Sequence, residues 1–130
     1  MENNVSNQNS FQDRNIRIYS ILAYIGILWI VGLLVKEKDN KTLKFHVGQG
    51  MLITILSFII SVFNNVVVSN IFVTTDYVLG VSYRRVTGFG LLIEGALGLC
   101  TLALMIIGIV NAANNKEEEL PVIGKFSFYK

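Results

Sequence analysis

The chain has 130 residues, of which 52% are hydrophobic and 15% charged, with a formal net charge of +2. This composition is too apolar for a disordered chain or an ordinary soluble domain, and the small net charge argues against a nucleic-acid partner, which would require a basic face. One cysteine and one histidine provide neither a disulfide framework nor the ligands of a zinc site, so we expect no metal and no cofactor.

The N-terminal part combines a polar stretch with a first apolar run. Residues 1–15 are rich in asparagine and are interpreted as a mobile tail, because they lack the basic start and cleavage site of a signal peptide. The uncharged run at 18–35 corresponds to roughly 27 Å of helix, close to the ~30 Å hydrocarbon thickness of a bilayer. It is therefore predicted to be the first membrane span.

The second apolar run, residues 45–75, follows a lysine-rich loop at 36–44. It corresponds to roughly 46 Å of helix, which is too long for one buried span and too short for two spans with a turn. We predict a span over about 45–65. The following residues 66–85 are rich in valine, threonine and tyrosine, and they are compatible with a helical extension, an interfacial segment or a β-hairpin.

The third apolar run is predicted to span the membrane over 88–113. Residues 116–130 form an acidic and then apolar tail, in which Pro121 ends helical structure. The predicted fold is therefore all-α: a polytopic integral membrane protein whose residues 16–115 form an antiparallel bundle of about three transmembrane helices. An interfacial element between helices two and three remains one of the options.

The distribution of lysine and arginine predicts the orientation of such a bundle. Three spans would place seven of these residues in the first loop and C-terminal tail, and four in the N-terminal tail and second loop. Positively charged loops stay in the cytoplasm. We therefore predict a multi-pass protein of the cell (inner or plasma) membrane with a cytoplasmic first loop and an external N-terminus.

Glu94 is the one ionisable residue within the third run. A carboxylate there is costly unless it is protonated, paired or water-facing. Helical spacing places it in a stripe of small and polar residues, which is typical of a surface that packs against protein. The stripe holds three candidate helix-packing positions: Gly90, Gly98 and Gly108. The second span carries a matching face of candidate polar partners: Ser57, Ser61 and Asn64. A packing role and a functional role for Glu94 are equally open.

Two strings carry a family resemblance: LKFHVGQG after the lysine-rich loop and GIVNAANNKEEELPVIGK after the third span. They resemble the chloroplast-import-component-like (Tic-twenty-like) family of small bacterial integral membrane proteins, mostly of unknown function, which is also similar to some magnetosome membrane proteins. The matching motif positions are Phe45, His46, Gln49 and Pro121. The resemblance implies a three- or four-helix membrane protein that assembles with itself or with other membrane proteins, and it does not imply an enzyme.

The sequence contains no constellation of nucleophile, base or paired carboxylates that would support catalysis. The leading hypothesis is a non-catalytic integral membrane protein that assembles through polar and glycine-lined helix faces, as a component of a membrane transport or protein-translocation assembly. Its expected partners are the lipid bilayer and either copies of itself or other membrane proteins, with no nucleic acid. The alternative is a homo-oligomeric proton- or ion-conducting protein that uses Glu94.

Overall fold

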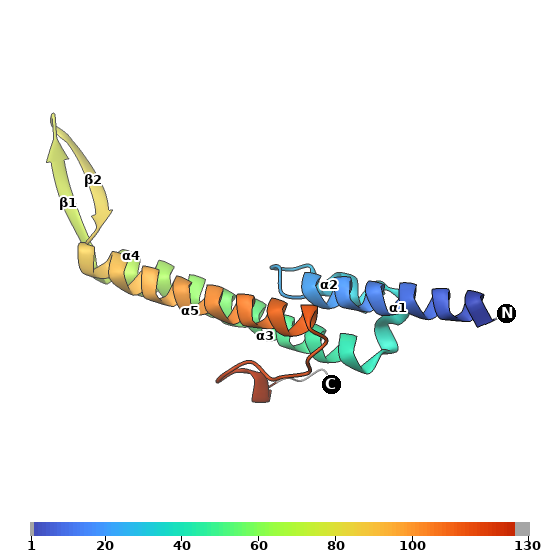
Figure 1. Cartoon of the computed structure of the whole chain (residues 1–130). Coiled ribbons are helices and arrows are strands. Elements are labelled where there is room, and N and C mark those ends of the chain that lie inside the picture. Colours follow the sequence, from blue (N-terminus) through green and yellow to red (C-terminus); the bar gives the residue numbers. More distant parts are fainter. Residues whose placement is uncertain (1, 127–130) are drawn as a thin grey trace. The chain divides into compact units, whose positions relative to one another are not determined.

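The structure, a computed structural model, describes the backbone of residues 2–126 and the side chains of residues 5–126. In chain order its elements are α1 (Glu2–Leu22), α2 (Trp29–Leu34), the 3₁₀ turn η1 (Lys36–Asp39), α3 (Lys41–Phe63), the π-helical η2 (Asn64–Val68), α4 (Ser69–Ile71), β1 (Val73–Val78), β2 (Val81–Val86), α5 (Gly88–Ala113) and η3 (Gly124–Phe126) (Figure 1). The fold is mostly helical, as predicted, but it contains a two-stranded sheet. The chain divides into two compact units, residues 1–55 with 103–130, and residues 56–102.

Two helical stretches are long and apolar enough to cross a membrane, Lys41–Ile71 and Gly88–Ala113. The first is continuous because η2 and α4 extend α3. Only 17% and 6% of their most apolar windows are buried inside the structure. A soluble protein would bury such helices in its core, whereas apolar surface left exposed over this length is what a lipid environment requires. The predicted second and third spans lie in these two stretches.

The predicted first span does not form one helix, so the three-span bundle is not confirmed. Helix α1 ends at Leu22, residues 23–28 form turns and a bend, and α2 begins only at Trp29. The break includes Gly26, whose φ of +54° is left-handed, a conformation that glycine adopts at little cost. The carbonyl oxygen of Gly26 accepts a hydrogen bond from the Thr54 hydroxyl at 2.8 Å. Hydropathy predicts where apolar residues gather, but this break depends on a contact with α3.

The polar stretch that precedes this break is also helical. Residues 2–15, interpreted from sequence as a mobile tail, form the first part of α1. The residues whose burial is described in this stretch are mostly exposed up to Ile16, the first buried residue. The mobility of this part and the domain boundaries stay predictions, and the last four residues of the predicted C-terminal tail lie outside the described range.

The core of the first unit forms where the end of α1 packs against α3 and α5. One cluster contains Ile16, Ala23, Leu43 and Val47, and a second contains Tyr24, Ile53, Ala112 and Leu120. Two glycines allow the close approach: a side chain at Gly50 would collide with the carbonyl of Ala23, and one at Gly108 would collide with the ring of Tyr24. Both glycines therefore bring the chain segments closer than any other residue would allow.

In the second unit, residues 66–85 are partly a helical extension and partly a β-hairpin. The strands β1 and β2 pair antiparallel from Val73 opposite Val86 to Val78 opposite Val81. The two connecting residues, Leu79 and Gly80, have φ values of 51° and 81°, as the tight type I′ hairpin turn requires. The valine, threonine and tyrosine content of this segment thus reflects strand propensity.

Candidate functional site

The most buried polar side chains lie in the first unit, where Tyr24, His46 and Gln49 form what we call the buried polar cluster. His46 and Gln49 are three residues apart on α3, so they share one face of the helix, and both are fully buried. The Tyr24 hydroxyl and His46 Nδ1 form a hydrogen bond of 2.8 Å. The Phe45 ring meets the His46 ring edge-on, with centroids 5.3 Å apart. These contacts fix the orientation of the imidazole.

Gln49 connects α3 to the segment that follows α5. Its amide nitrogen donates a hydrogen bond to the Gly124 carbonyl at 3.1 Å, and its amide oxygen accepts one from the Leu120 N–H at 3.3 Å. Leu120 is buried, and Gly124 lies so close to Gln49 and Glu119 that a side chain there would have no room. Pro121 lies within the segment held in this way. The motif positions Gln49 and Pro121, far apart in the sequence, therefore belong to one docking arrangement.

Several buried polar atoms make no hydrogen bond within the described residues: Ser20 Oγ, Trp29 Nε1, His46 Nε2 and Asn64 Oδ1. His46 Nε2 is the one with acid–base chemistry, but the cluster supplies neither a carboxylate nor a second histidine. Among the described residues no group of three or more His, Cys, Asp or Glu side chains is placed to hold a metal. On this geometry, the cluster holds the turn after α1, helix α3 and the C-terminal segment together.

Glu94 lies in the part of α5 that belongs to the second unit and is half-buried. No hydrogen bond or ion pair joins it to Ser57, Ser61 or Asn64, nor to any other residue that the structure describes. The Ser61 carbonyl instead accepts a hydrogen bond from the Asn65 side chain at 2.8 Å. The roles predicted for Glu94 and these three residues therefore stay predictions.

The glycines of the Glu94 stripe divide into two kinds. A side chain at Gly90 would collide with Val86 and Phe72, and one at Gly108 would collide with Tyr24, so both positions pack within the chain. A side chain at Gly98, like one at the neighbouring Gly95, would meet nothing within 4 Å. The middle of the stripe thus has no partner in the described chain.

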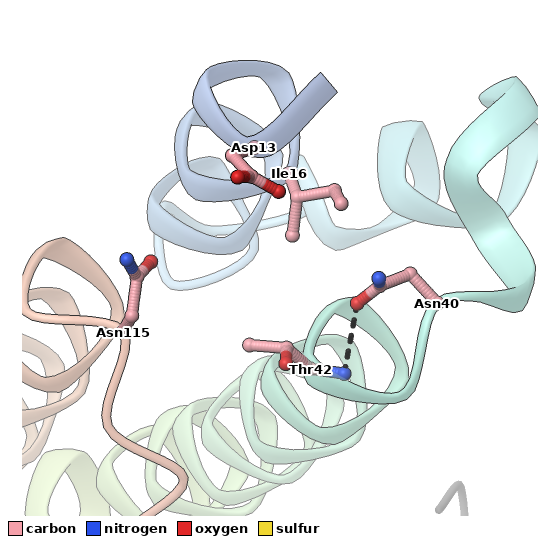
Figure 2. A pocket seen from close by; sticks show the side chains of 5 residues that line it. All are labelled: Asp13, Ile16, Asn40, Thr42 and Asn115. Carbon is pink, nitrogen blue, oxygen red and sulfur yellow. Dashed lines mark hydrogen bonds between the residues drawn. The ribbon is translucent and has the colours of Figure 1, made fainter. Parts of the chain in front are cut away.

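A polar pocket of about 120 Å³ lies in the first unit, and Figure 2 shows the five residues that line it: Asp13, Ile16, Asn40, Thr42 and Asn115. Asn40 Oδ1 accepts hydrogen bonds from the Thr42 N–H at 2.9 Å and the Leu43 N–H at 3.2 Å, which caps the first turn of α3. The adjacent Glu117 accepts a hydrogen bond from the Thr42 hydroxyl. Two of the five lining residues, Asn40 and Thr42, thus take part in capping α3.

Sequence reasoning missed Leu120 and Gly124, the backbone partners of Gln49, and it did not pair Tyr24 with His46. Tyr24 lies in an apolar run, where an aromatic residue carries no distinct signal. Gly124 offered a weak one, because a glycine three residues after Pro121 often marks a turn. The spacing of polar residues along one helix cannot identify such partners, since they come from other parts of the chain.

Comparison with known proteins identifies one family. A model of the MamF/MmsF family, described as the magnetosome magnetite crystal formation protein family, matches residues 13–127. The predicted resemblance to the Tic-twenty-like family was therefore wrong; it rested on short motifs in an apolar background, where chance similarity is common. No curated protein and no solved structure gives a significant match.

Proposed function

Because the chain belongs to the MamF/MmsF magnetosome magnetite crystal formation protein family, we propose that it is a non-catalytic membrane component of magnetite crystal formation that works by assembly within the membrane. The family match supports a location in the magnetosome membrane and a role in magnetite crystal formation. The two apolar helices, Lys41–Ile71 and Gly88–Ala113, support the placement in a bilayer. Transport and protein translocation have no support from the family and are not retained.

The observation that carries assembly is the open middle of the Glu94 stripe on α5. Gly95 and Gly98 leave room that no described residue fills, and the half-buried Glu94 makes no described polar contact. In a lipid environment a carboxylate and a glycine face are stabilised by a facing helix, through hydrogen bonding and close packing. A second copy of the chain or another membrane protein would provide that helix.

The mass of the complex extracted in mild detergent tests assembly. Gly98→Leu places a large side chain where a facing helix would approach, so we expect a smaller complex, with the fold intact because the position is open. Ala96→Leu adds comparable bulk to an exposed position about 200° around the helix, and it should leave the mass unchanged. Equal masses for wild type and both variants would contradict assembly through this face.

The role in crystal formation is tested in a magnetite-forming host that carries the wild-type gene, a deletion or the Gly98→Leu variant. We expect the tagged protein to fractionate with magnetosome membranes and the deletion to change the size distribution of the crystals seen by electron microscopy. Restoration by Ala96→Leu but not by Gly98→Leu would link crystal formation to assembly. Unchanged crystals in the deletion would refute the proposed process.

Proton or ion conduction through Glu94 is the alternative function to be tested, because the Glu94 carboxylate makes no described polar contact. Hydrogen bonding across an interface survives Glu94→Gln, whereas proton exchange does not. We expect Glu94→Gln to retain the wild-type complex mass and wild-type crystals. A flux across liposomes that wild type shows and Glu94→Gln lacks would instead favour conduction.

A further inference from the structure

The first apolar run packs along α3, and up to Gly26 its contacts lie progressively further from the start of α3. Ile16 belongs to the same core cluster as Leu43, near the charged start of α3. Ten residues later, the Gly26 carbonyl accepts the hydrogen bond from Thr54, eleven residues further along α3 than Leu43. Over this part the chain therefore moves away from the lysine-rich loop.

After Gly26 the chain returns toward the start of α3. Gly32 lies against the Val47 side chain, so that no larger residue would fit there. Val35 packs against the cluster that contains Leu43, the same cluster to which Ile16 belongs. Figure 1 shows α2 running back beside α1 after the intervening loop. Both ends of the run thus lie at the same end of α3.

Contacts with α5 indicate the same chain direction for the part of the run that precedes Gly26. The Arg17 guanidinium donates a hydrogen bond to the Asn115 side chain at 3.4 Å, just beyond the end of α5. Tyr24 packs on Gly108. The step from Arg17 to Tyr24 is seven residues forward and the step from Asn115 to Gly108 is seven residues back, so the two segments run antiparallel at the end of α5.

The depth reached is about half a bilayer. Thr54 lies ten residues beyond Lys44, the last charged residue at the start of α3, which is roughly 15 Å of helix against a hydrocarbon thickness of ~30 Å. A spanning segment would have to run on to the far end of Lys41–Ile71. The turn at Gly26 comes well before that.

Much of the irregular backbone at the turn is hydrogen-bonded, which favours a position at this depth. The Gly26 carbonyl accepts from the Thr54 hydroxyl. The N–H groups of Leu28 and Ile30 donate to the carbonyls of Ile25 and Ile27, at 3.1 and 3.2 Å. These hydrogen bonds lower the cost of non-helical backbone at this depth, although residues 25–28 themselves are exposed.

We propose that residues 18–35 form a re-entrant segment, which enters the membrane to about half its depth and leaves on the side from which it came. The protein would then cross the membrane only twice, through Lys41–Ile71 and Gly88–Ala113. This topology rests on the membrane placement of those helices and not on a role in magnetite formation.

The charge distribution supports the two-crossing topology independently. It places residues 1–17, the first loop and residues 116–130 on one side, with nine of the eleven lysine and arginine residues, and leaves only Arg84 and Arg85 on the other. The three-span arrangement divides the same residues seven to four. The larger asymmetry fits the positive-inside rule better, so the N-terminal residues lie in the cytoplasm instead of outside.

One consequence concerns the β-hairpin at Val73–Val86. It connects the last residue of Lys41–Ile71 to the first residue of Gly88–Ala113, whereas the lysine-rich loop precedes Lys41–Ile71. In this topology the hairpin is the only element of the described chain on the non-cytoplasmic side. Any contact of the described residues with molecules on that side would therefore use the hairpin.

Cysteine labelling tests the topology on the full chain. In a Cys100→Ala background, single cysteines at Gln12, Lys38 and Ser82 are treated with a membrane-impermeant maleimide on intact spheroplasts, and again after permeabilisation. We expect only Ser82→Cys to react before permeabilisation, and all three to react afterwards. Labelling of Gln12→Cys together with Ser82→Cys, while Lys38→Cys stays protected, would overturn the re-entrant segment. Labelling of Gln12→Cys and Lys38→Cys without Ser82→Cys would retain it but reverse the cytoplasmic assignment.

The sign of a stability change provides a second test. A straight spanning helix would gain stability from Gly26→Ala, because alanine is the better helix former. The re-entrant turn loses stability, since alanine disfavours the left-handed φ and no steric collision contributes. We expect the folding equilibrium constant in detergent to fall roughly fivefold. Gly95→Ala, at an open position inside α5, should raise it, and a rise for both variants would contradict the proposal.

Discussion

Gln49 joins α3 to the segment after α5 through both ends of its side-chain amide. Its amide group satisfies one backbone donor and one backbone acceptor in the segment after α5, at Leu120 and Gly124. Its own burial is complete. A backbone group left unpaired in such a place costs about 1–3 kcal/mol. Gln49 therefore supplies buried polar contacts between α3 and the C-terminal segment, in addition to the exposed contacts of Lys41 and Thr42 with Glu117.

Gln49→Leu keeps the size of the side chain but removes both hydrogen bonds. We expect the free energy of unfolding in detergent to fall by about 2 kcal/mol, because the Leu120 N–H and the Gly124 carbonyl lose their partner. Trypsin should then cleave faster at Lys125. Gln12→Leu, the same change at an exposed position of α1, is the control. If both variants unfold and are cleaved as wild type is, the docking role of Gln49 is wrong.

The β-hairpin is an element of unusual composition, because its turn begins with an apolar residue. Leu79 is 99% exposed and has a left-handed φ of 51°, which costs a non-glycine residue about 1 kcal/mol. The strands gain from an ion pair between Arg85 and Asp76 at 3.4 Å, but an isolated pair of strands is only marginally stable in water.

Leu79→Asn should therefore stabilise the hairpin. Asparagine tolerates the left-handed conformation, and Asn-Gly is the preferred pair for a type I′ turn. We expect a gain of about 0.5–1 kcal/mol, measured as slower hydrogen exchange of the strand amides. Leu79→Val should act in the opposite direction, because a β-branched residue is strained at positive φ. Faster exchange in Leu79→Asn than in wild type would show that the turn has a different conformation.

The whole molecule is organised by its two long apolar helices, whose side chains are largely exposed. Helix α5 alone corresponds to roughly 39 Å, more than the ~30 Å hydrocarbon thickness. Leu99, in its middle, is 67% exposed and would contact lipid or another chain. Leu79, at the tip of the hairpin, is also exposed but lies outside any crossing helix.

These two leucines provide a matched test of membrane placement. Leu99→Lys puts a charge at the centre of a crossing helix, where insertion costs about 2.5 kcal/mol or more, so we expect less protein to resist carbonate extraction. Leu79→Lys makes the same chemical change at the hairpin tip and should insert as wild type does. Equal insertion of the two variants would mean that α5 does not cross the hydrocarbon region.

The sequence by itself determined what depends on local composition. The apolar runs and the lysine-rich loop predicted a membrane protein with three spans, because side-chain transfer energies add along a helix wherever it lies. Two of those predicted spans, 45–65 and 88–113, lie in helices long and apolar enough to cross a bilayer, Lys41–Ile71 and Gly88–Ala113. Phe45, His46 and Gln49 also stood out as a motif. Whether Glu94 is functional stays a prediction that neither the sequence nor the fold tests.

Only the tertiary structure decided the course of residues 18–35 and the partners of the motif. Their hydropathy is that of a span, but a left-handed Gly26 and its hydrogen bond from Thr54 turn the chain back. Gln49 likewise meets Leu120 and Gly124 only because the segment after α5 folds onto α3. Each of these features depends on groups that are distant in sequence, and local propensity carries no information about such pairs.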